Sequence, residues 1–142
     1  MNSLLGLIVS LAFVVLALWH FRMAYRPLSG DGGAVPSVSG KPLFVPSRRS
    51  CVIVGIVLLL FAGLVAATAG IVRPGLPPLA LSWLSYALAV GLLGRAVGEF
   101  RYVGFFKRVR GSRFATLDTF VYSPLCVALA LGVALVARHS GA

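Results

Sequence analysis

Four long runs of apolar residues, separated by polar stretches of very different lengths, dominate the pattern along the chain. The runs cover about residues 3–21, 51–72, 79–98 and 119–137. A helix of about 20 apolar residues crosses the roughly 30 Å hydrocarbon core of a bilayer. Because a backbone in lipid has to satisfy its own hydrogen bonds, such runs form helices. The pattern therefore predicts an all-α membrane protein, a bundle of four transmembrane helices.

The polar stretches are too short to form a second domain. Residues 22–50 are rich in Gly, Pro and Ser, and the turn 73–78 contains three prolines. An independent core below about 40 residues is uncommon, so we expect one transmembrane domain over residues 1–142, with loops 22–50 and 99–118. The first run has no basic residues before it and no small-residue cleavage site after it. We interpret it as a retained span rather than a cleaved signal peptide.

Composition excludes a soluble enzyme. The chain is 59% hydrophobic and 11% charged, whereas soluble domains carry about 25% charged residues. Disorder is excluded as well, because it requires low hydrophobicity. The net charge of +10 would suggest nucleic acid in a soluble protein. Here the cations flank apolar runs, so we expect anionic lipid as the partner and no nucleic acid.

The cations also predict the orientation of the chain. Of the 13 Lys and Arg residues, Arg95 lies inside the third span. Two more, Arg73 and Arg138, lie at the ends of the spans away from the two longer loops. The other ten lie in or beside the two longer loops: Arg22, Arg26, Lys41, Arg48, Arg49, Arg101, Lys107, Arg108, Arg110 and Arg113. Short basic loops stay in the cytoplasm. We therefore predict a multi-pass membrane protein with both termini facing the outside or periplasm and both basic loops facing the cytoplasm.

Arg95 is the clearest candidate for a binding residue, because charges at membrane depth face a bundle interior or a watery cleft. On a helix it shares a stripe with Gly91, Glu99 and Tyr102 that we expect to face other helices, and Glu99 is spaced to pair with it. This arrangement fits either a structural staple or a site for an anionic group. Small residues at Gly94/Gly98, Gly63/Ala67 and Ala128/Gly132 predict packing within the bundle, with a homodimer as the alternative.

Residues 100–114 interleave aromatic and basic side chains. Read as a helix, they place Tyr102, Val103, Phe106 and Val109 on one face, which predicts a basic amphipathic segment on the inner leaflet. A simple topology anchor is the alternative. The predicted ligand-binding residues are Arg95, Glu99, Arg101, Tyr102, Lys107 and Tyr122.

Three other groups are candidates for proton transfer. They are His20 at the end of the first span, Glu99, and Asp118 before the fourth span. Asp118 also fits a helix N-cap. Ser123 followed by Pro124 offers a second start, but we favour a start near Asp118 with a bend at Pro124. No metal site or cofactor is predicted, because the other histidine, His139, belongs to the opposite face.

The stretch 95–126, RAVGEFRYVGFFKRVRGSRFATLDTFVYSPLC, resembles the signature of a bacterial family called domain of unknown function 3995. His20 at the end of the first span and the segment VPSVSGKPLFVP before the second agree with this resemblance. The family implies topology only and brings no activity.

Three functions remain open from the sequence. The first is a binding module for an anionic lipid or isoprenoid phosphate at the cytoplasmic helix ends, with Arg95, Arg101 and Lys107 on the head group and Glu99 orienting Arg95. The second is an accessory subunit of a larger membrane complex. The third is a small membrane enzyme that moves protons through Glu99, Asp118 and His20.

Overall fold

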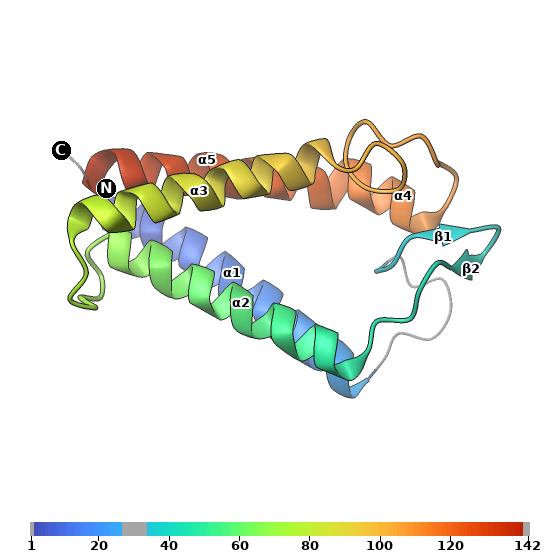
Figure 1. Cartoon of the computed structure of the whole chain (residues 1–142), viewed down its shortest axis with the longest axis horizontal. Coiled ribbons are helices and arrows are strands. Elements are labelled where there is room, and N and C mark those ends of the chain that lie inside the picture. The colour runs from blue at the N-terminus through green and yellow to red at the C-terminus, as the bar shows by residue number, and fades with distance from the viewer. Residues whose placement is uncertain (1, 27–33, 141–142) are drawn as a thin grey trace.

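The computed structural model describes residues 2–26 and 34–140, which contain four long helical segments (Figure 1). They are α1 (Asn2–Tyr25), α2 (Arg48–Thr68), α3 (Pro78–Val97), and a continuous segment of α4 (Arg113–Leu117), the π-helical turn η1 (Asp118–Tyr122) and α5 (Ser123–Ser140). All four segments are long and apolar enough to cross a membrane. The predicted all-α, four-helix architecture is confirmed.

The helices form two antiparallel pairs, α1 with α2 and α3 with α5 (Figure 1). The pairs lie close together near the two chain termini and diverge toward α4. A short antiparallel hairpin of β1 (Ser37–Val38) and β2 (Lys41–Pro42) lies at the divergent end. The sequence did not predict this hairpin, because two-residue strands leave no alternating pattern.

The core lies where the two pairs meet. Phe13 of α1, Val65 of α2 and both Val133 and Val136 of α5 are fully buried. The ring of Phe13 packs edge-to-face on Phe61, with centroids 5.8 Å apart. Many other large apolar side chains point outward, as expected of helices whose outer faces contact lipid tails.

Buried hydroxyl groups connect the helices near the termini. Ser10 of α1 donates to the carbonyl of Ala62 in α2 at 3.1 Å. Thr68 at the end of α2 lies 2.9 Å from Ser85 of α3, and Ser82 lies 3.0 Å from Ser140. These bonds help to fix the packing of the two pairs, because a hydroxyl in an apolar interior is costly without a partner.

Only part of the predicted small-residue packing is present. Gly132 of α5 packs against Val9, where a Cβ would lie 2.7 Å from the Val9 side chain. Gly63, Gly91 and Gly94 instead face open space within the described part of the chain. The prediction that the glycine stripe of α3 faces other helices of this chain is therefore wrong.

The fourth segment begins earlier than predicted. Ser112 caps α4 by accepting from the backbone N–H of Ala115 at 3.0 Å, so Asp118 is an internal residue and not the N-cap. The π-helical turn ends at Tyr122, two residues before Pro124. Proline has no N–H to donate to the carbonyl four residues earlier and its ring crowds that carbonyl, and a π turn is one way for the helix to accommodate it.

Candidate functional site

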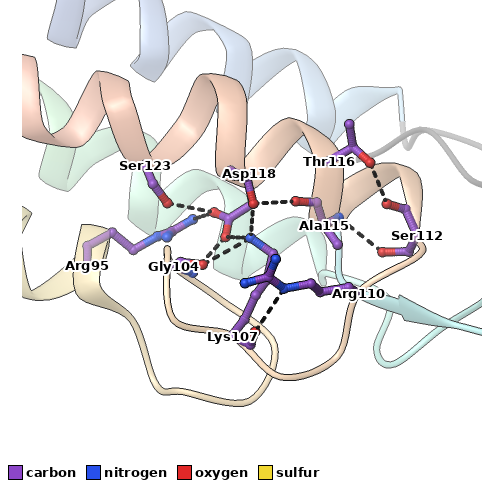
Figure 2. Close-up of polar contacts among 10 residues, drawn as sticks. Arg95, Gly104, Lys107, Arg110, Ser112, Ala115, Thr116, Asp118 and Ser123 are labelled. Carbon is purple, nitrogen blue, oxygen red and sulfur yellow. Dashed lines mark hydrogen bonds and ion pairs between the residues drawn. The ribbon is translucent and has the colours of Figure 1, made fainter.

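A buried carboxylate lies at the centre of the most polar cluster in the described part of the chain. Asp118, at the start of η1, has no exposed side-chain surface. Its Oδ1 accepts from Arg95 Nη2 at 2.9 Å and from Ser123 Oγ at 3.5 Å. Its Oδ2 accepts from the backbone N–H of Gly104 at 2.6 Å and from Lys107 Nζ at 3.1 Å. Figure 2 shows these groups converging from α3, the following loop and the fourth helix.

Lys107 is buried beside Asp118 and uses all of its hydrogen-bonding capacity there. Its Nζ atom lies 3.1 Å from Asp118, 3.0 Å from the carbonyl of Gly104 and 2.6 Å from the hydroxyl of Thr119. An ammonium has three hydrogens. Lys107 therefore has none left for a headgroup, and the prediction that it binds one is wrong.

Arg95 reaches the same carboxylate from the end of α3, but it is less enclosed than Lys107. Its side chain is 37% exposed. One terminal nitrogen, Nη2, bonds Asp118, whereas the other, Nη1, is buried and has no hydrogen-bond partner. Since two cations share one carboxylate, the cluster carries one excess positive charge.

The loop 98–112 is folded tightly back on the end of α3. The backbone N–H of Phe105 donates to Ala96 at 2.8 Å, and that of Val109 donates to Arg101 at 2.9 Å. Gly98 and Gly104 have φ values of 84° and 91°. A Cβ at Gly98 would collide with the Val103 carbonyl, and one at Gly104 with the Val97 carbonyl. Because Gly98 and Gly104 have no side chains, the backbone at the end of α3 can pack directly against the backbone at residues 103–104. This contact brings the Gly104 N–H to Asp118.

The loop is not the amphipathic helix that the sequence predicted. Residues 99–112 form bends and turns, because α3 ends at Val97 and Gly98 continues in a left-handed conformation. The loop still presents aromatic and basic side chains outward. Phe100 and Phe106 are exposed, with ring centroids 6.4 Å apart. The arginines exposed on or beside the loop are Arg101, Arg108, Arg110 and Arg113.

The structure separates Glu99 from Arg95. Glu99 lies beyond the end of α3 and is exposed, in a shallow depression with Arg101 and Arg108. Among the ion pairs of the described residues, 2–26 and 34–140, none joins Glu99 to Arg95. The predicted Arg95–Glu99 pair is wrong, and Asp118 takes the place of Glu99 as the partner of Arg95.

The remaining predicted residues lie in different surroundings. The guanidinium of Arg101 lies 5.1 Å from the ring centre of Tyr102. Tyr122 is half-buried, and its ring lies 5.9 Å from that of Phe114. His20 lies near the end of α1, where its Nδ1 is 2.8 Å from the carbonyl of Leu16.

His20, Glu99 and Asp118 do not form a proton-transfer site in this structure. No hydrogen bond or ion pair connects any two of them in the part of the chain that the structure describes. Asp118 accepts four hydrogen bonds and is enclosed, so it lacks a free lone pair for a substrate proton. The cluster acts instead as a clamp that fixes the loop to α3 and η1.

Sequence reasoning missed Gly104, Thr119 and Ser123 as members of this cluster, and it missed Gly98 as the residue whose backbone packs against Gly104. The two glycines were the available signal, since they bracket five residues directly after an apolar run. The need for positive φ at both positions follows only from the three-dimensional contact.

The cluster lies inside the region that matches a known family. A family model described as "Protein of unknown function (DUF3995)" matches residues 12–133. No curated protein matches the chain, and no solved structure does.

Proposed function

The chain belongs to the DUF3995 family of proteins of unknown function, and we propose from its own geometry that it binds anionic phospholipid headgroups at the end of the bundle that carries the Asp118 cluster. The protein would be a lipid-binding protein of the bacterial inner membrane. The loops 22–50 and 99–118 would face the cytoplasm and both termini the periplasm. The excess of cations beside these two loops supports this orientation.

The observation that carries the proposal is that the loop 98–112 buries one of its cationic side chains and exposes the others. Lys107 turns inward and neutralises Asp118, whereas Arg101 and Arg108 remain exposed beside Phe100 and Phe106. Arginine binds phosphate through a planar set of donors. Aromatic rings are favoured at the level of the headgroups. The exposed arginines therefore suit lipid phosphate groups, and the exposed aromatic rings suit the adjoining acyl chains.

Arg95 contributes to this surface indirectly. Its Nη2 is held by Asp118, and its other terminal nitrogen, Nη1, is buried without a partner. We therefore expect Arg95 to help hold the loop in place and Arg101 and Arg108 to contact the headgroup.

The test is lipid retention by the purified protein. Native mass spectrometry would count molecules of phosphatidylglycerol and phosphatidylcholine bound after mild detergent extraction. We expect a preference for phosphatidylglycerol that falls about tenfold in the Arg101→Gln/Arg108→Gln double variant, because each charge-assisted bond contributes about 1.5–3 kcal/mol before screening at an exposed site.

Arg22→Gln/Arg26→Gln is the matched control. It removes two cations from the end of α1 and leaves the 98–112 surface intact. A loss of equal size in both double variants would show that only net charge matters, and the proposed site would be wrong.

A further inference from the structure

A cavity lies at the end of the bundle opposite the Asp118 cluster. It has a volume of about 500 Å³, is open on one side to its surroundings, and is lined by the starts of α1 and α3, the ends of α2 and α5, and the turn between α2 and α3. Small-molecule sites typically measure about 300–1,000 Å³. The residues of its wall that bear on binding are Asn2, Thr68, Arg73, Leu81, His139 and Ser140.

Two basic side chains line this cavity. Arg73 comes from the turn after α2 and His139 from the last turn of α5, and both are exposed. Glu99 and Asp118, the acidic residues in the described part of the chain, belong to the opposite end of the bundle. Arg73 therefore has no carboxylate partner among the described residues, and its guanidinium is free to bind an anion.

The hydrogen bond of His139 leaves its second ring nitrogen available. Nδ1 lies 2.7 Å from the carbonyl oxygen of Leu135. A carbonyl only accepts, so Nδ1 carries the hydrogen, and Nε2 is left for another partner. When protonated, Nε2 donates to an anion beside Arg73.

The rest of the wall is mixed in character. The Oδ1 atom of Asn2 is buried and accepts no hydrogen bond, which is unusual for a buried amide oxygen. The hydroxyls of Thr68 and Ser140 already bond Ser85 and Ser82. Leu81 is an apolar part of the wall. A ligand that fits would combine an anionic group, a hydrogen-bond donor and a short apolar part.

We propose that this cavity binds a phosphate ester that bears a hydroxyl or amine group, with Arg73 and His139 on the phosphate and Asn2 accepting from the donor. This site is separate from the lipid surface at the Asp118 end and involves other residues. The same chemistry occurs in the headgroup of a phospholipid and in a small free ester such as glycerol 3-phosphate. The test distinguishes these two sources.

The experiment uses the full chain with the Arg101→Gln/Arg108→Gln substitutions, so that the opposite end contributes little to lipid binding. Glycerol 3-phosphate is titrated by calorimetry, and phosphatidylglycerol by native mass spectrometry. Binding of the free ester identifies a soluble ligand, and binding of the lipid alone identifies a headgroup. Failure of both probes would overturn the proposal and leave the function proposed for the other end untouched.

Variants then locate the binding. Arg73→Gln should weaken ligand binding about tenfold. His139→Gln should weaken ligand binding several-fold, and this variant tests the site if Arg73→Gln fails to fold. Arg138→Gln is the matched control, because Arg138 is exposed on the same turn of α5 but is not in the cavity wall. Unchanged binding in folded Arg73→Gln and His139→Gln, or an equal loss in Arg138→Gln, would overturn the proposal.

Discussion

The ammonium of Lys107 and the carboxylate of Asp118 lie 3.1 Å apart, and both side chains are almost completely buried. A buried charge without a partner costs several kcal/mol, so each of these groups requires the other. Because Lys107 belongs to the loop and Asp118 to the fourth helix, their pairing determines where the loop lies. The exposed arginines of the loop depend on this pair for their positions.

The first prediction concerns the carboxylate itself. Asp118→Asn removes the negative charge while Lys107 stays buried, and places an amide N–H₂ near one or another of the donors that face the carboxylate. We expect a loss of about 3–5 kcal/mol in the free energy of unfolding. Thermal unfolding in detergent would measure the loss, and hydrogen exchange would show that the amides of Gly104 and Phe105 are no longer protected.

Glu99→Gln is the matched control for this variant, because Glu99 is an exposed acid in the same loop. Its effect should stay within about 0.5 kcal/mol. Equal unfolding temperatures for Asp118→Asn and Glu99→Gln would contradict the role assigned to Asp118.

The second prediction tests the coupling of the pair. Lys107→Met leaves Asp118 bonded to Arg95, Gly104 and Ser123, so it should destabilise the protein less than Asp118→Asn does. In the double variant the two losses should not add, and the interaction energy should reach about 0.5–3 kcal/mol. Arg108→Met, at an exposed position of the same loop, should have little effect. Simple additivity of the two substitutions would show that the pair is not coupled.

The third prediction concerns the crossing of Gly98 and Gly104. Alanine at either position adds the strain of positive φ, about 1–2 kcal/mol, and a collision with a backbone carbonyl. Gly111→Ala shares the positive φ but faces open space, so it should cost the strain alone. Gly94→Ala, in the helical and open part of α3, should cost nothing. The expected order of unfolding temperatures is Gly94→Ala highest, then Gly111→Ala, with Gly98→Ala and Gly104→Ala lowest.

The sequence predicted the spans well because their signal is local. Runs of about 20 apolar residues define α1, α2 and α3 without knowledge of any contact. The observed helix boundaries differ from the predicted ones where a capping residue determines them. Ser112 caps α4, so the helix begins at Arg113, five residues before the predicted start near Asp118. A serine in a basic, glycine-rich stretch is a weak cap signal until the preceding loop is known.

The site was predicted only in part, because its bonds join residues far apart in the chain. Arg95 and Lys107 both appeared as candidate binding residues and Asp118 as a candidate acid, but the local spacing favoured Arg95 with Glu99. That pairing requires α3 to continue through residue 99. Gly98 ends the helix one residue before Glu99, so the acid 23 positions away becomes the partner of Arg95.

The last prediction tests the orientation on which the proposed lipid site depends. In a chain with Cys51→Ser and Cys126→Ser, one new cysteine is placed at Leu76, in the exposed turn between α2 and α3, or at Val38, in the exposed hairpin at the opposite end. A membrane-impermeant maleimide should label Leu76→Cys in cells with a permeabilised outer membrane. It should label Val38→Cys only after the inner membrane is disrupted, because the proposed orientation places the cation-rich loops on the cytoplasmic side. Labelling in the reverse order would place the arginines of loop 98–112 on the outer surface, where the anionic inner leaflet would be out of their reach.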